Sequence, residues 1–287
     1  MGGELSKVVV LMVPLLFGCG AESGRERPAS GTASQAEQPV PPDLRADIAR
    51  SIAVGSQLYV LDKVAAIGTD VLFANVQHPE AQGVVGYVPL REGDADGRGR
   101  NSYLVSFFTE DDPPRVAYEI RVLPDAQPEF QAFAPPKDVP PGFAALIRAR
   151  QAAIAAMPTP KQPINPVVIP GEVAGEVLVY LLAGTKQPDL AVFGQHFRAV
   201  VAMGGSSVRS MTPLSNTVLE VPTRAPNGEP AEGLAVSHAV TDFPLETHVF
   251  TSLLHQKVVY VGTRRGMWRV EGDKISFLGK AESKAAE

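Results

Sequence analysis

The chain has 287 residues, 45% of them hydrophobic and 20% charged, which is enough to bury one large core or two small ones. Its net charge of −5 argues against the basic surface that nucleic-acid-binding proteins use, so no nucleic-acid partner is expected. The single cysteine, Cys19, excludes a disulfide within the chain, and its place near the start excludes cysteine chemistry in the folded body.

The first segment has the features of an export signal. An apolar run of ten residues, Val8 to Phe17, follows Lys7. Such a run is too short to cross a bilayer as a permanent helix, which needs about 20 residues, but it has the length of a signal-peptide core. The run closes with Leu16-Phe17-Gly18-Cys19, in which an apolar residue lies three places before the cysteine and a small one directly before it. This pattern resembles the lipobox of bacterial lipoproteins.

The resemblance implies how the chain is processed and where it resides. In bacterial lipoproteins the peptide is cut before the cysteine, whose thiol carries a diacylglyceryl group. Residues 1–18 would then be the signal peptide, and Cys19 the lipidated first residue, with this covalent lipid as the only expected cofactor. Two or three acyl chains make a lasting anchor, because each buried methylene contributes roughly 0.8 kcal/mol. An ordinary cleaved signal peptide is the alternative.

The residue after the cysteine indicates in which membrane such a protein is anchored. In enterobacterial lipoproteins an Asp there often marks inner-membrane retention, whereas this chain has Gly20. The resemblance therefore implies a cell-envelope protein that is lipid-anchored at the outer membrane and faces the periplasm or the surface.

The composition of residues 19–42 predicts a disordered tether. Gly, Ala, Ser, Glu, Gln, Arg and Pro dominate this segment, and they bury too little apolar surface to offset the entropy lost on ordering. Order is expected from Asp43, which suits a helix N-cap and precedes an apolar stripe with helical spacing. The stripe predicts a helix over 44–60 and consists of Leu44, Ile48, Ile52 and Tyr59.

The rest of the first half predicts an antiparallel sheet followed by a second helix. Runs rich in Val, Phe and Tyr, separated by turn residues, predict strands. These runs are residues 71–76, 84–88, 102–109 and 115–122. Apolar residues with helical spacing from Phe143 to Met157 then predict a helix of about fifteen residues. We expect an N-terminal α+β half over 43–157.

Prolines follow this helix and predict an extended connector over 158–170, because each proline fixes its own backbone and restricts the residue before it. The connector is either a boundary between two domains or a stiff link inside one. The C-terminal half, 171–279, is predicted to be almost entirely β, with a frayed tail over 280–287. Its expected strands are 176–183, 197–203, 208–214, 234–240, 247–254 and a final meander.

The meander allows a statement of register. If Gly272-Asp273 is a two-residue hairpin turn, Glu271 faces Lys274, and Val270 faces Ile275. Trp268 then faces Phe277, so the apolar pairs share one face. The predicted fold class is α+β, mostly antiparallel sheet with two main helices, the C-terminal half being β-rich and ending in a β-meander.

The second half is also similar to uncharacterised secreted proteins of proteobacteria. The resemblance covers about a third of the chain and lies in four segments, 178–182, 194–198, 246–250 and 268–272. It implies a secreted β-rich body and brings no activity with it.

Two histidines are the strongest candidates for a metal site. If residues 234–240 and 246–252 form a hairpin, His238 lies directly opposite His248, with β-carbons about 5 Å apart. Two imidazoles so placed bind a divalent metal if Asp242, Glu246 or another carboxylate completes the coordination. The alternative is a pair of strand-surface histidines, because no HExxH-like spacing accompanies them.

Other catalytic patterns are weaker. Ser237 and His238 are adjacent on a predicted strand and point to opposite faces, and the chain has no Gly-x-Ser-x-Gly elbow. Residues 93–100 begin like a calcium loop, but the twelfth position counted from Asp94 is Val105 rather than a carboxylate. We therefore expect a non-catalytic binding or accessory protein of the cell envelope, whose partner is a small ligand or an envelope protein. A metal-assisted hydrolase using His238 and His248 is the alternative.

Overall fold

The computed structural model describes residues 36–93, 102–160, 162–170, 173, 175–204 and 207–280. The predicted signal peptide, Cys19, most of the tether, the loop over 94–101 and residues 281–287 lie outside the described residues. Within them the fold is α+β and mostly antiparallel, as predicted, and its C-terminal part is β-rich. The described strands form three four-stranded sheets and one two-stranded ribbon.

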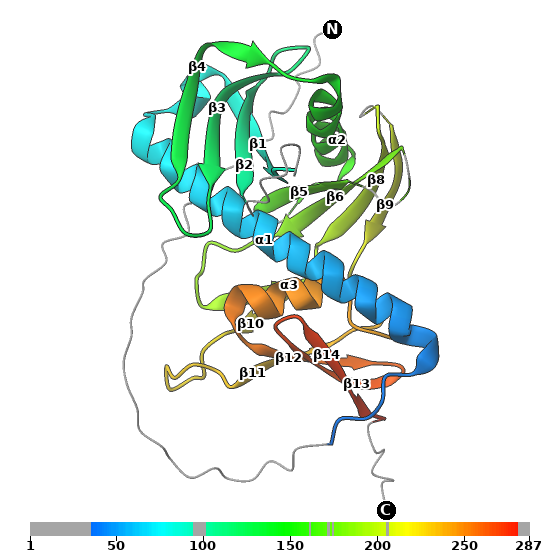
Figure 1. Cartoon of the computed structure of the whole chain (residues 1–287). Coiled ribbons are helices and arrows are strands. Elements are labelled where there is room, and N and C mark those ends of the chain that lie inside the picture. The colour runs from blue at the N-terminus through cyan, green and yellow to red at the C-terminus, as the bar shows by residue number, and fades with distance from the viewer. Residues whose placement is uncertain are drawn as a thin grey trace, which may run out of the picture.

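One long helix, α1 (Arg45–Asn75), runs through the molecule and packs against all three larger sheets (Figure 1). Its buried residues recur every three or four positions, from Ile48 to Leu72, and form one continuous stripe. The helix predicted over 44–60 is therefore too short, and the strand predicted over 71–76 is wrong. No proline separates the two segments, and packing of the helical stripe overrides the strand preference of Val71.

The predicted N-cap is also wrong. Asp43 lies in a short 3₁₀ helix, η1 (Pro42–Leu44), and makes no capping hydrogen bond to α1. Its carboxylate instead binds Arg265, at 2.9 Å, from the far end of the chain. A second 3₁₀ helix, η2 (Pro79–Gln82), leads from α1 into the first sheet.

The first sheet is an antiparallel meander that covers the C-terminal half of α1 (Figure 1). Its strands are β1 (Val84–Arg91), β2 (Tyr103–Thr109), β3 (Arg115–Val122) and β4 (Glu129–Asp138). The first three were predicted. The fourth was missed because Pro135 and Pro136 argue against a strand, but β4 lies at the sheet edge, where missing N–H groups are tolerated.

The second sheet lies between helices on both faces. Its strands, in spatial order, are β5 (Ile164–Pro170), β6 (Glu176–Ala183), β8 (Phe197–Ala202) and β9 (Val208–Pro213). Helix α2 (Pro141–Ala156), which was predicted, packs on one face, and residues of α1 and α3 pack on the other. The Pro-rich connector is extended, as predicted, and supplies edge strand β5.

The third sheet contains a parallel pair that the sequence did not predict. Strand β11 (Gly233–Ser237) pairs in parallel with β12 (Val258–Thr263), and the connection between them is helix α3 (Glu246–His255). The strand predicted over 247–254 is therefore wrong. Its apolar residues, Val249, Phe250 and Leu253, suit one helical face as well as a strand, and α3 packs against α1 through that face.

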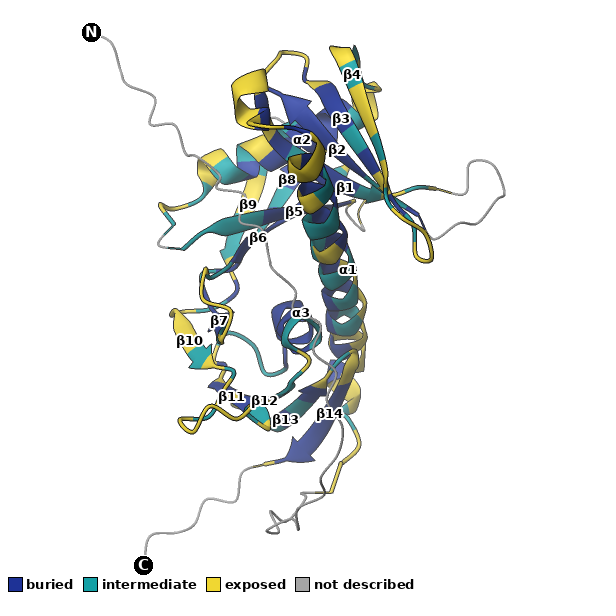
Figure 2. Cartoon of the chain, turned by 90° about the vertical axis from the view of Figure 1, so that its left-hand side faces the viewer, coloured by how far each residue is buried: buried dark blue, intermediate teal, exposed yellow. Residues whose placement is uncertain are grey.

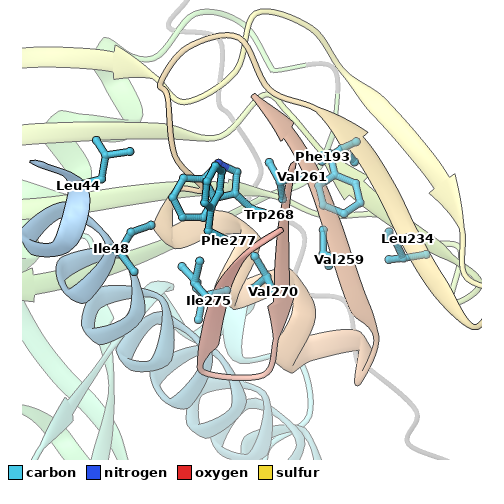
Figure 3. Packing of buried hydrophobic residues seen from close by; sticks show 13 residues of the cluster. Leu44, Ile48, Phe193, Leu234, Val259, Val261, Trp268, Val270, Ile275 and Phe277 are labelled. Atoms are coloured by element: carbon cyan, nitrogen blue, oxygen red, sulfur yellow. The ribbon is translucent and has the colours of Figure 1, made fainter. Parts of the chain in front are cut away.

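The final meander matches its prediction. Strands β13 (Gly266–Glu271) and β14 (Lys274–Gly279) pair Glu271 with Lys274, Val270 with Ile275, and Trp268 with Phe277. The Trp268 and Phe277 rings lie 4.7 Å apart, and Figure 3 shows them facing the start of α1. The remaining strands, β7 (Leu190–Phe193) and β10 (Leu219–Pro222), form the ribbon beside α3.

Burial follows these contacts (Figure 2). The side of α1 that meets the sheets is buried, whereas β4 and the loop before β11 are largely exposed. The four apolar clusters each include residues of more than one element, and α1 contributes to three of them. The two halves of the sequence therefore share the helix that holds the fold together.

Gly55 sets the distance between α1 and α3. A β-carbon at this position would lie 2.5 Å from the carbonyl oxygen of Glu246 and 2.6 Å from Cβ of Val249. We expect Gly55→Ala to destabilise the fold by about 1–3 kcal/mol, although Gly→Ala in a helix interior usually stabilises. Gly142→Ala in α2 is the control, because a β-carbon there meets nothing within 4 Å. Urea unfolding measures the free energy of unfolding of both variants. Equal changes for Gly55→Ala and Gly142→Ala would show that α1 and α3 can move apart at little cost.

Candidate functional site

A buried carboxylate, Glu246, stands at the first turn of α3 and is 1% exposed. Its Oε1 accepts hydrogen bonds from the Tyr180 hydroxyl at 2.8 Å and from Arg198 Nη1 at 2.9 Å. Tyr180 and Arg198 face each other across β6 and β8, so the second sheet presents both donors on the face that meets α3. Positive charge from Arg198 and from the helix N-terminus offsets the cost of burying this carboxylate.

The hydroxyl of Tyr180 remains a donor in this setting. Burial, together with the neighbouring Glu246, raises the pKa of Tyr180 well above its usual range. The phenol is therefore protonated at neutral pH and bonds to the carboxylate through its O–H. This arrangement holds α3 against the second sheet.

Three buried imidazoles lie near one another, and one of them, His238, lies near Glu246. His196 precedes β8, His238 follows β11, and His248 lies in the first turn of α3; all three are at most 6% exposed. The backbone N–H of Ala183 donates to Nδ1 of His196 at 3.0 Å, and that of Leu245 donates to Nδ1 of His248 at 3.0 Å. Both rings therefore carry their proton on Nε2 when neutral.

These histidines are held in the neutral state by their surroundings. Burial lowers the pKa of His196 to about 4, against a weaker opposing effect of the Val192 carbonyl. Burial, with smaller contributions from the nearby His238 and His196, lowers the pKa of His248 to about 3. The pKa of His238 is lowered by burial and raised in part by Glu246.

The hairpin that was expected to pair His238 with His248 does not exist, because residues 246–255 are helical. The two rings nevertheless lie together, with centroids 4.8 Å apart in an edge-to-face arrangement. Nε2 of His238 lies 2.9 Å from Oγ1 of Thr241. Among the residues that the structure describes, no group of three or more His, Cys, Asp or Glu side chains is arranged to hold a metal ion.

Next to this cluster is a depression of about 700 Å³, which we call the charged depression, lined by Asp242, Arg264, Arg265 and Lys280. Asp242 belongs to the β11–α3 loop, and the two arginines directly follow β12, so the depression lies at the carboxyl ends of the parallel strands. Sequence reasoning missed it. The only local signal was the Arg264-Arg265 pair in the region of the predicted final meander, and the other lining residues come from distant positions.

The walls of the charged depression are tied together. Arg264 Nε lies 3.3 Å from Asp242 Oδ1, and Arg265 Nη2 contacts both oxygens of Asp43 at 2.9 Å. Thr263 links the β11–α3 loop to β12, because its Oγ1 lies 3.1 Å from the Asp242 carbonyl. The Trp268 indole donates to the same Oγ1 at 3.1 Å, which connects this wall to the core.

A second buried charge, Arg150, lies where α2 meets the first sheet. Its guanidinium is 5.6 Å from the Tyr87 ring centroid and 5.5 Å from that of Phe108. Its Nε and Nη2 are buried without a hydrogen-bond partner among the described residues. Burial lowers the pKa of Arg150 to about 10, which leaves it charged at neutral pH. Because these atoms also lack contact with solvent, Arg150 is part of the packing and not an open binding group.

A polar chain continues from Tyr87 to α1. The Tyr87 hydroxyl donates to Asn165 Oδ1 at 2.6 Å, and Asn165 Nδ2 donates to Asp62 Oδ1. Burial raises the pKa of Asp62 to about 6, and the Asn165 hydrogen bond opposes this shift. These side chains join α1, β1 and β5, and we assign them a structural role.

Within the described ranges, no helix combines the length and the apolar character needed to span a bilayer. Searches against protein-family models, curated proteins and solved structures found no match for the chain.

Proposed function

We propose that the chain is a lipid-anchored protein of the cell envelope that binds a ligand without transforming it. The lipobox resemblance at Leu16 to Cys19 supports the anchor. The charged depression supports the binding role, because it is an open feature that gathers charged groups from three separate segments of the chain.

The proposal of a non-catalytic role depends on the hydrogen bonds and the protonation of the buried side chains that could otherwise act in catalysis. His196 and His248 each accept a backbone hydrogen bond, and Glu246 accepts bonds from Tyr180 and Arg198. The lowered pKa values of His196 and His248 leave both imidazole rings neutral at physiological pH. Groups engaged in this way stabilise the packing of α3 against the second sheet instead of acting on a substrate.

The anchor is tested by replacing the cysteine. We expect Cys19→Ser to move the protein from the membrane fraction to the soluble fraction, because the thiol that would carry the acyl chains is absent. Mass spectrometry of the wild-type N-terminal peptide should find diacylglyceryl on Cys19 and no residue before it. A wild-type chain with a bare thiol, or one that still carries the residues before Cys19, would rule the anchor out.

A metal-assisted hydrolase is the second candidate, favoured by the contact between the His238 and His248 rings at 4.8 Å. Two imidazoles at this separation meet one divalent ion if their rings rotate. If this reading is right, the purified full chain holds one zinc or similar ion, and His248→Ala loses it. His255→Ala, at the other end of α3, is the control. Metal analysis that finds less than one ion in ten chains contradicts this candidate.

A further inference from the structure

The charged depression has an excess of positive charge. Arg264, Arg265 and Lys280 line it together with one carboxylate, Asp242. Counting Asp43, which binds Arg265, the group has three cations and two carboxylates. A ligand that fits this charge balance is an anion.

The arginines keep donors for such an anion. Arg265 uses a single nitrogen, Nη2, for both oxygens of Asp43, and Arg264 approaches Asp242 through Nε. A guanidinium has five N–H donors, so these contacts occupy a minority of them. Asp242 Oδ1 has no hydrogen-bond partner among the described residues. Its interaction with Arg264 is therefore electrostatic only, and the Arg264 guanidinium can turn toward a ligand without breaking a hydrogen bond to Asp242. Arginine forks match the paired oxygens of a phosphate.

The place in the fold is one where ligands bind. Strands β11 and β12 are parallel and joined by α3, and the charged depression lies outside their carboxyl ends. In doubly wound parallel sheets the loops beyond the carboxyl ends of the strands form the binding crevice, and the single β11–α3–β12 unit of this mixed sheet has the same local arrangement.

The N-terminal segment packs along β14 before Asp43 reaches Arg265 at the charged depression. Gln38 N–H donates to the Phe277 carbonyl at 2.7 Å, and Glu37 contacts Lys274 on β14 at 3.0 Å. Figure 1 shows the chain entering α1 beside the end of the β13–β14 hairpin. If the anchor proposed above is present, the number of residues between Cys19 and Glu37 limits this part of the body to at most roughly 60 Å from the membrane surface.

We propose that the charged depression binds a phosphate group through Arg264, Arg265 and Lys280, supplied either by a lipid headgroup of the anchoring membrane or by a soluble phosphate ester. This inference rests on the binding role proposed above and identifies its ligand class. Its lipid source also depends on the anchor, whereas its soluble source does not.

The test uses the full chain with Cys19→Ser, so that no lipid of its own holds it to membranes. In the first arm, inorganic phosphate and glycerol phosphate are titrated at constant ionic strength, with chloride as the reference, and binding is measured by calorimetry. Loss of two charge-assisted contacts in Arg264→Gln/Lys280→Gln should weaken binding by about tenfold or more. Arg224→Gln is the control, because Arg224 pairs with Asp189 on another part of the surface.

In the second arm, the same chains are sedimented with vesicles of phosphatidylglycerol mixed with phosphatidylcholine. Vesicle binding that the double substitution abolishes and Arg224→Gln preserves identifies a lipid headgroup, whereas loss confined to the first arm identifies a soluble ester. Binding that is equal in all variants, or no saturable binding in either arm, overturns the inference. These outcomes leave the membrane fractionation of the wild-type chain, which tests the anchor, unaffected.

Discussion

Lowering the pH from 7 to 5 should cost the folded protein about 3 kcal/mol of stability, mainly through its buried histidines. In the unfolded chain an imidazole titrates near 6.5, whereas burial lowers the pKa of His196 to about 4 and that of His248 to about 3 in the fold. Below pH 6.5 the unfolded state therefore binds more protons, and stability falls with pH until the folded pKa values are reached. Each histidine contributes a loss of about 2 kcal/mol at pH 5.

Asp62 opposes part of this loss. Burial raises its pKa from 3.8 to about 6, so between pH 6 and pH 4 the folded state binds the extra proton and gains stability as the pH falls. The gain at pH 5 is about 1 kcal/mol, which explains why the expected net loss is smaller than the sum of the two histidine effects.

Urea unfolding of the full chain at pH 7, 6 and 5 measures this dependence. His196→Asn keeps an acceptor near Ala183 N–H but does not titrate, and it should reduce the loss between pH 7 and pH 5 by about 2 kcal/mol. His78→Asn is the control, because the His78 side chain is 81% exposed. A free energy of unfolding that stays level from pH 7 to pH 5 would mean that water reaches these imidazoles in the folded state.

Elements fixed by local chemistry could be predicted from the sequence. The β13–β14 register follows from a two-residue turn and from alternation of Trp268 and Val270 with polar neighbours, and the structure has that register. Helix α2 was likewise identified from its spacing. Segments with mixed signals were not. Val71 and Thr247 favour strands by propensity, yet both lie in helices, because α1 buries a helical face against the sheets and α3 buries one against α1.

The positions of the polar side chains could likewise be predicted only in part from the sequence. His238 and His248 were paired through a hairpin, whereas the structure brings them together from a loop and a helix. Tyr180 and Arg198 were not singled out, because nothing local shows that β6 and β8 turn their shared face toward Glu246. The charged depression joins Asp242 and Lys280 with an arginine pair, and that proximity depends on the parallel β11–β12 pairing.

Arg198→Met should lower the free energy of unfolding by about 3 kcal/mol, because it removes the cation that faces a buried carboxylate. Glu246 is 1% exposed. Of the two side-chain donors now bound to its carboxylate, the variant would keep only the Tyr180 hydroxyl. Arg198 itself is a quarter exposed, so solvent screens part of the interaction and the effect lies at the lower end for a buried pair. Methionine preserves most of the aliphatic contact, so the loss reports the charge.

The control is Arg209→Met on the neighbouring strand β9. Arg209 pairs with Glu176 in an exposed position, and such pairs contribute about 0–1 kcal/mol. Combining Arg198→Met with Glu246→Gln should recover part of the loss, because a neutral amide costs less to bury than an unpaired charge. If Arg198→Met costs no more than Arg209→Met, the Glu246 carboxylate is reached by solvent in the folded protein. The buried polar cluster would then be open to ligands, which favours the hydrolase candidate over a purely structural role.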